Sequence, residues 1–213
     1  MDAENLKNIE QRSDAWRQIR CGSVTASRIA DLTAKTKSGY SASRANYMAQ
    51  LICERLTGLP QESFTNAAMQ WGTDQEPIAR AEYEALQGVF VEEMGFAAHP
   101  TIESSGASPD GLIGSDGLIE IKCPNTATHI ETLLSGEPDA KYVKQMQWQM
   151  SCTGRAWCDF VSFDPRMPEN LRLYVKRVQR DDSLIAELEE EVRKFLAELE
   201  GKVLKLKGLT NAH

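Results

Sequence analysis

Cysteine and histidine are too few and too scattered in this sequence to suggest a metal centre built from them. The 213 residues include five cysteines, none in a C-x-x-C pair, and three histidines that lie far apart in the chain. Structural zinc sites and iron–sulfur clusters draw closely spaced ligands from these residue types. The sequence therefore argues against both kinds of centre, and the odd number of cysteines favours reduced thiols.

Long apolar runs are also missing. No uninterrupted apolar stretch approaches the length that crosses a membrane. The first residues show neither the basic start nor the apolar stretch of a secretory leader. We therefore expect a protein that contacts no membrane and works in a cytoplasm.

The composition is that of an ordinary globular protein, with 41% hydrophobic and 26% charged residues. The length predicts one domain over residues 1–213. The net charge of −7 is unusual for a protein that holds nucleic acid. However, basic residues concentrate in residues 12–44 and 166–180, and acidic residues in residues 187–200. This separation is compatible with a basic surface around DNA, or with a solvated charge mosaic.

Two carboxylates and one amine occur within a short predicted hairpin. Residues 118–122 alternate as in a strand, which places Glu120 and Lys122 on one face and two isoleucines on the other. If residues 115–117 form the loop, Asp110 falls opposite Lys122 and diagonal to Glu120. A shift of one residue would send Asp110 to the other face.

Two carboxylates on one face repel each other unless a positive charge lies between them. Mg²⁺ prefers carboxylate and water oxygens, and it can activate water and offset charge on a phosphate. Lys122 would orient that water or stabilise the transition state. An exposed hairpin with scattered charges and a salt bridge is the alternative, because this spacing also occurs by chance.

Five blocks in order resemble the phage lambda exonuclease, or YqaJ-type viral recombinase, family, which carries the PD-(D/E)-x-K nuclease pattern. Any one block would be a weak signal, but five in order are a strong one. They span about residues 14–180 and are Arg20-x-Gly22-x-x-Thr25-Ala26-Ser27, Trp71-Gly72-x-x-x-Glu76, Ser108-Pro109-Asp110-Gly111-Leu112 with Leu118-x-Glu120-x-Lys122-Cys123-Pro124, Tyr142-x-x-Gln145-x-Gln147, and Asp164-Pro165-Arg166-Met167.

The resemblance implies roles for individual residues. Asp110, Glu120 and the carbonyl of Ile121 would be metal ligands, Lys122 the catalytic lysine and Glu76 an acidic helper. The cofactor would be Mg²⁺, with Mn²⁺ as a substitute.

A second set of positions matches the residues that bind the 5′-phosphate of a DNA end in this family. Guanidinium, hydroxyl and amide groups are good phosphate donors. Met69 falls where the family places an apolar residue against the terminal base pair. The matching phosphate-binding positions are Arg20, Ser27, Ser108 and Gln145.

Each of these residues also has an ordinary structural interpretation. Arg20 is compatible with a surface arginine, and Ser27 with a helix cap. Glu76 precedes a proline and would suit a helix N-terminus. Gln145 would be solvated on a helix, and Met69 would belong to the core.

The sequence predicts an α/β fold, with a mixed sheet flanked by helices and a long C-terminal helix over about residues 181–207. That helix either packs on its own domain or forms an interface with another chain. Residues 38–43 suggest an exposed loop. The expected helices are residues 47–56, 77–86 and 140–153, with a short helix or turn at residues 14–20 and a connector and short helix over residues 124–135. The expected strands are residues 89–94, 95–99, 118–122, 156–164 and 171–178.

The resemblance implies a 5′→3′ exonuclease that degrades one strand of linear double-stranded DNA to 5′ mononucleotides. It further implies a homotrimeric ring, a single-strand annealing protein as partner in recombination, and a bacterial or phage-infected cell. An endonuclease of restriction or repair is the nearest alternative. A non-catalytic DNA-binding module is another, but it would need none of Asp110, Glu120 and Lys122.

Overall fold

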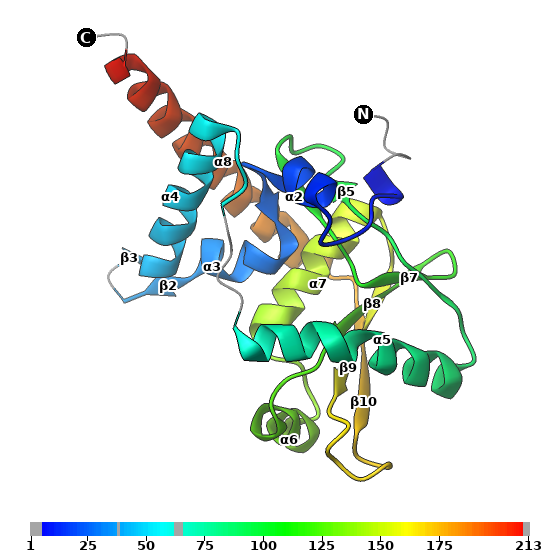
Figure 1. The fold of residues 1–213 in the computed structure, drawn as a ribbon. Helices are drawn as coiled ribbons and strands as arrows, with labels where there is room; N and C mark the ends of the chain where they lie inside the picture. The colour runs from blue at the N-terminus through cyan, green and yellow to red at the C-terminus, as the bar shows by residue number, and fades with distance from the viewer. Residues whose placement is uncertain (1–5, 38, 62–65, 211–213) are drawn as a thin grey trace.

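A five-stranded mixed sheet forms the centre of the computed structural model, which describes residues 6–37, 39–61 and 66–210. Helices cover both faces of this sheet, and a group of helices lies beside it (Figure 1). The elements in chain order are α2 (Asp14–Arg20), β1 (Val24–Thr25), η1 (Ala26–Arg28), α3 (Ile29–Thr33), β2 (Lys35–Thr36), β3 (Gly39–Tyr40), α4 (Ala42–Thr57), α5 (Ala67–Gln87), β4 (Val91–Glu92), β5 (Ala97–Ala98), β6 (Ser105–Ala107), β7 (Gly111–Ile113), β8 (Gly117–Lys122), α6 (Thr126–Ser135), α7 (Ala140–Thr153), β9 (Trp157–Phe163), β10 (Leu173–Gln179) and α8 (Asp182–Thr210).

The strand order in the central sheet is β10-β9-β8-β7-β4. Only the contact between β8 and β9 is parallel, and the other three contacts are antiparallel. A parallel contact requires a crossover connection, and here α6 and α7 lie in the chain between β8 and β9. This confirms the predicted mixed sheet flanked by helices. A smaller sheet has the order β1-β6-β5, and β2 pairs with β3.

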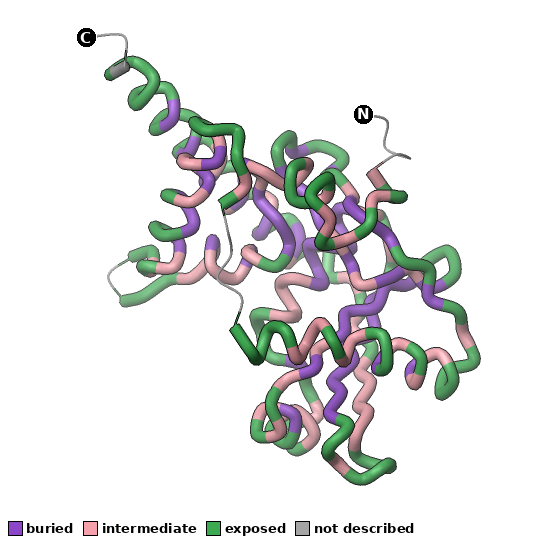
Figure 2. Tube along the Cα trace, viewed as in Figure 1, coloured by how far each residue is buried: buried purple, intermediate pink, exposed green. Residues whose placement is uncertain are grey.

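The central strand β8 is buried on both faces, because different helices cover them. On one face Ile119 and Ile121 pack in a cluster that includes Tyr83 of α5. On the other face Leu118 packs in a cluster that includes Met146 of α7. The alternation expected for residues 118–122 is therefore present, but both faces are buried up to Ile121, and only Lys122 at the end of the strand is partly exposed. Figure 2 shows the buried strands running between the helices.

Helix α7 begins and ends where the sequence predicts. Asp139 precedes it and its side chain accepts a hydrogen bond from the backbone N–H of Lys141. Gly154 ends the helix in the left-handed conformation, with φ 72°, which costs glycine little. These two residues set where the helix that carries Gln145 begins and ends.

The C-terminal helix α8 packs on its own chain. Its apolar residues face α3 and α4 in one buried cluster, which confirms the first interpretation of its periodicity. The buried members from α8 are Leu188, Val192, Phe195, Leu199 and Val203.

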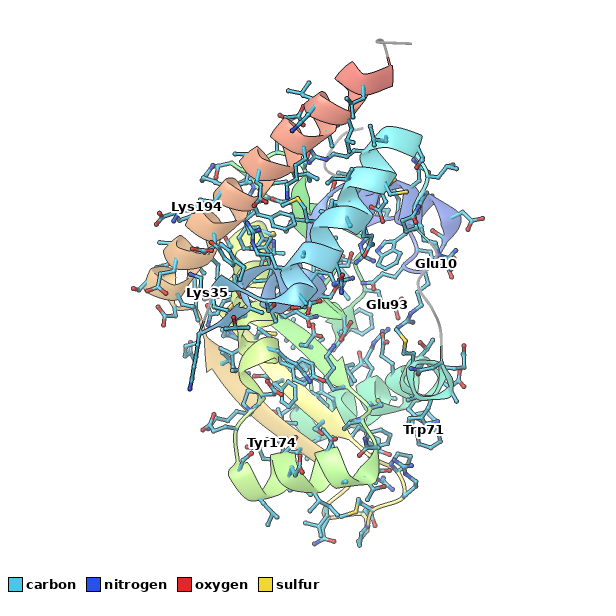
Figure 3. All side chains as sticks on the ribbon, turned by 90° about the vertical axis from the view of Figure 1, so that its left-hand side faces the viewer. Glu10, Lys35, Trp71, Glu93, Tyr174 and Lys194 are labelled. Carbon is cyan, nitrogen blue, oxygen red and sulfur yellow. The ribbon has the colours of Figure 1, made fainter. Side chains whose placement is uncertain are left out.

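Helix α8 also forms ion pairs with basic side chains from the first part of the chain. Lys35 lies 3.4 Å from Glu191, and Arg44 lies 2.8 Å from Glu198. Lys194 contacts the same Glu191, and Lys35 and Lys194 lie along the same side of the molecule (Figure 3). The charges of Lys35 and Arg44 are therefore paired within the chain.

Several expected boundaries are wrong. Helix α5 begins at Ala67, where Asn66 caps it, so Glu76 lies inside the helix and Pro77 does not start it. The strands expected at residues 89–94 and 95–99 shorten to β4 and β5, which belong to different sheets. Residues 39–43 form β3 and the start of α4 rather than a loop, and Ser38 lies outside the described residues.

No helix in the described part of the chain is both long and apolar enough to span a membrane.

We expect Phe195→Ala to lower the free energy of unfolding by about 3–5 kcal/mol, because it opens a cavity in a fully buried cluster. Leu204→Ala on the same helix is the matched control, since Leu204 is 60% exposed, and its effect should stay within about 0.5 kcal/mol. Urea denaturation measures both. Equal losses for the two variants would contradict the packing of α8 described here.

Candidate active site

The hairpin of β7 and β8 brings the two predicted carboxylates to the same level of the sheet. Gly111 pairs with Ile119, and Ile113 pairs with Gly117, so residues 114–116 form the loop. The expected loop of residues 115–117 is wrong, and the register differs by two residues. Asp110 thus lies level with Glu120 rather than with Lys122. Because the shift is even, Asp110 keeps the expected face.

Asp110 is fixed by its neighbour strand and surrounded by negative charge. Its Oδ2 accepts a hydrogen bond of 2.6 Å from the backbone N–H of Ile121. Burial raises the pKa of the Asp110 carboxyl well above its ordinary range, and the charges of Glu120 and Glu76 raise it further. The charge of Lys122 acts in the opposite direction but does not balance these effects.

Glu120 is fully buried and held by three side chains. Gln145 of α7 donates to its Oε1 at 2.7 Å, and Gln149 donates to its Oε2 at 2.5 Å. Lys122 forms an ion pair with Oε1. Gln149 lies one turn after Gln145 and was not predicted, because a polar residue on a helix is usually solvated. The solvated interpretation of Gln145 is wrong, because Gln145 donates to the buried Glu120 carboxylate.

The carboxylates around Lys122 favour its charged form. Burial alone would lower the pKa of Lys122, but the nearby Glu120 and Asp110 charges raise it above its ordinary value. The lysine side chain is 28% exposed, so it can still reach a ligand in the cavity.

Arg20 differs from the neighbouring arginines because none of the described carboxylates pairs with it. Arg12, Arg17 and Arg28 each form an ion pair. Among the residues that the structure describes, Arg20 forms none, and its buried Nε has no hydrogen-bond partner. Its guanidinium stacks over Trp16 at 3.7 Å from the ring centroid. Burial lowers the pKa of Arg20 to about 10, so it remains charged at neutral pH.

The carboxylates and Arg20 line the same cavity, whose volume is about 180 Å³. Ser27 and Ser108 also line it, as predicted for the phosphate-binding set, and Gln145 does so too. The complete lining is Gln11, Arg12, Trp16, Arg20, Ala26, Ser27, Ser108, Asp110, Glu120, Lys122 and Gln145.

Gln11 and Trp16 were not predicted as site residues, yet they attach the N-terminal segment to the residues just before Asp110. Gln11 Nε2 donates to the carbonyls of Met94 and Pro109, each at 2.8 Å. Trp16 Nε1 donates to Ser108 Oγ at 2.9 Å. Contacts between such distant residues leave no periodic signal in the sequence.

Glu76 and Met69 lie on α5 and do not line the cavity. Glu76 forms ion pairs with Arg12 and Arg80, and it influences Asp110 through its charge. Met69 lies in the first turn of α5 and is 52% exposed, so it is not a core residue. The roles assigned to both residues stay predictions.

The donor set fits a hard divalent cation. No group of three or more His, Cys, Asp or Glu side chains is arranged for metal binding within the described ranges. Asp110 and Glu120 are two carboxylates, and Mg²⁺ is commonly held by one or two carboxylates while keeping several waters. The excess of negative charge around Asp110 is the feature that a cation would relieve.

The mixed sheet flanked by helices, with Asp110, Glu120 and Lys122 together on it, has the arrangement expected for a nuclease of the PD-(D/E)-x-K type. The chain belongs to the YqaJ-like viral recombinase domain family, whose model matches residues 15–156.

The chain is similar to solved exonucleases along most of its length. An alkaline exonuclease, LHK-Exo, from Laribacter hongkongensis is 56% identical, with 94% of this chain and 99% of that chain covered and a TM-score of 0.88. LHK-Exo in complex with dAMP gives 55% identity over the same shares and a TM-score of 0.89. These matches confirm the prediction that the chain is an exonuclease.

A phage-related exonuclease from Haemophilus somnus 129PT shares the fold. It is 16% identical, with 86% of this chain and 96% of that chain covered and a TM-score of 0.68. None of the curated proteins matches the chain.

We expect Gln149→Leu to lower kcat by roughly 10- to 100-fold, because the buried Glu120 carboxylate loses one of the hydrogen bonds that orient it. Gln147→Leu is the matched control on the same helix. Gln147 is also buried, but it bonds to the backbone at Gln179 and Asp181. Gln147→Leu should therefore lower the stability of the fold and leave kcat close to the wild-type value. Equal kcat losses in the two variants would show that Gln149 acts only through folding.

Proposed function

We propose that this protein is a Mg²⁺-dependent 5′→3′ exonuclease that degrades one strand of linear double-stranded DNA. The observation that carries the proposal is that Arg20, which forms no ion pair with any described residue, lines the same cavity as Asp110 and Glu120. A cleaving group and an anion-binding group in one cavity suit a substrate whose end carries a phosphate. That LHK-Exo binds dAMP supports a DNA substrate and a mononucleotide product.

The terminal phosphate would bind at Arg20. A guanidinium presents several N–H donors to phosphate oxygens, and the hydroxyls of Ser27 and Ser108 line the cavity beside it. Trp16 holds both Arg20, through its ring, and Ser108, through its N–H. The phosphate-binding groups are thereby positioned before a substrate arrives, which lowers the entropy lost on binding.

Asp110, Glu120 and the carbonyl of Ile121 would hold the magnesium ion, with Mn²⁺ as a substitute. When bound, the ion supplies Lewis-acid activation of water and neutralises charge on the scissile phosphate. Gln145 and Gln149 keep Glu120 oriented, and the backbone N–H of Ile121 keeps Asp110 oriented. Charged Lys122 stabilises the negative charge that grows on the phosphate oxygens.

The product would be 5′ mononucleotides, and the remaining strand a 3′ overhang for recombination. A homotrimeric ring, a single-strand annealing partner, Glu76 as acidic helper and Met69 at the terminal base pair belong to the same proposal. So does action in the cytoplasm of a bacterial or phage-infected cell. Membership of the YqaJ-like family supports these parts.

The proposal is tested with linear duplexes carrying 5′-phosphate or 5′-hydroxyl ends and with a closed circle, each with magnesium. We expect rapid loss of phosphorylated duplex, slower loss of hydroxyl duplex and an intact circle. Cleavage of the circle would favour an endonuclease of restriction or repair. Binding without any cleavage would favour a DNA-binding module.

In the same assay, Arg20→Ala should reduce the preference for phosphorylated ends by roughly tenfold or more, because the charge-assisted contact to the phosphate is lost. Arg17→Ala is the matched control, since Arg17 lies on the same helix and pairs with Asp14. If Arg20→Ala slows both end types equally, the assignment of the phosphate pocket is wrong.

Asp110→Asn should lower the rate by roughly a thousandfold or more, the effect of removing several kcal/mol of metal-assisted catalysis. Circular dichroism should show an unchanged fold, because the asparagine oxygen can still accept the hydrogen bond from Ile121. A folded variant with near-normal turnover would exclude Asp110 as a ligand.

A further inference from the structure

Arg12 lines the catalytic cavity, although the sequence patterns assign it no role. It lies immediately before Ser13, the cap of α2, and its side chain is 47% exposed. Its guanidinium forms an ion pair with Glu76 of α5. The neighbouring Glu10 lies on the same side of the molecule as α5 (Figure 3). Arg12 therefore connects the N-terminal segment to α5 at the edge of the cavity.

The backbone of Arg12 is held in an unfavourable conformation. Its φ is 70°, and among the described non-glycine residues only Ser104 also has a positive φ. Both neighbours are fixed: Gln11 bonds to Met94 and Pro109, and Ser13 bonds to the carbonyl of Glu10 and caps α2. Strained residues persist where the surroundings impose them, and they concentrate at functional sites. Here the strain orients an arginine at the cavity.

Glu76 does not depend on Arg12 alone for a cationic partner. Glu76 also contacts Arg80, at 3.3 Å, so it keeps a cationic partner if Arg12 leaves. The Glu76 side chain is 13% exposed, whereas Arg12 is the exposed partner. Exposed ion pairs contribute little to stability, while guanidinium and phosphate form a strong paired contact. A phosphate group can therefore compete with Glu76 for Arg12.

We propose that Arg12 binds a phosphodiester group of the substrate strand at the edge of the cavity, exchanging Glu76 for phosphate. This inference rests on the proposed DNA substrate. Arg20, with its buried Nε, suits the terminal phosphate, whereas half-exposed Arg12 suits the strand where it leaves the cavity. Arg12 thus positions every substrate strand, whichever group stands at its 5′ end.

The test uses Arg12→Gly and Arg12→Lys, assayed on duplexes with both end types over a range of salt concentrations. We expect Arg12→Gly to raise KM by roughly 10- to 100-fold for both ends equally, the effect of losing a charged contact. Its salt dependence should be weaker, because fewer counterions are released on binding. Arg12→Lys keeps the charge and should recover part of the loss.

The thermal midpoint separates substrate binding from a structural role. Glycine adopts a positive φ without strain, so Arg12→Gly should unfold at the wild-type temperature or above it. Arg193→Ala is the control for losing a half-exposed, ion-paired arginine away from the cavity, and its KM should equal that of wild type. A normal KM in Arg12→Gly, or a lowered midpoint with a loss that Arg12→Lys does not recover, would overturn the proposal.

The two proposals fail in different ways. If the wild-type protein leaves linear duplex DNA intact, the proposed function is wrong. If the wild-type protein degrades it and Arg12→Gly does so with the same KM and salt dependence, only the role of Arg12 is wrong.

Discussion

The burial of Glu120 is the constraint that joins the sheet to the rest of the molecule. A carboxylate removed from water costs several kcal/mol unless hydrogen bonds and opposite charge compensate. Here Gln145, Gln149 and Lys122 provide both. Because the two glutamines lie one turn apart on α7, the same contacts dock that helix against β8.

Helix α7 also packs against the group of helices beside the sheet. Met146 and Met150 pack against the sheet, while Trp148 belongs to the buried cluster of α3, α4 and α8. Glu120 and the C-terminal helix Asp182–Thr210 are thus coupled through one element. The charges follow a similar division, since α8 pairs with Lys35 and Arg44, while Arg20 at the cavity forms no ion pair with the part of the chain that the structure describes.

The sequence predicts the parts of the site that follow local periodicity. Alternation places Glu120 and Lys122 on one face of a strand, and Gly154 ends the helix expected over residues 140–153. The register of the hairpin differs because turn residues allow loops that start one or two residues apart, which local sequence does not distinguish. The very short strands β1, β5 and β6 carry too few residues for a pattern.

Contacts between distant residues account for what sequence reasoning missed. Gln11 reaches Pro109, and Trp16 reaches Ser108, through hydrogen bonds that join the first residues to the middle of the chain. Gln149 carries no sign of burial in its own neighbourhood, because glutamine on a helix is usually solvated. Such residues are recognised only when the fold brings a charged partner to them.

The central claim is that one cavity holds both the cation and the 5′-phosphate. Diffraction from crystals of the protein grown with Mn²⁺ and dAMP tests it directly, because manganese gives an anomalous signal. We expect a manganese peak between Asp110 and Glu120 and the nucleotide phosphate on Arg20 with Ser27 and Ser108. Manganese bound elsewhere, or a phosphate that leaves Arg20 without a partner, would contradict it.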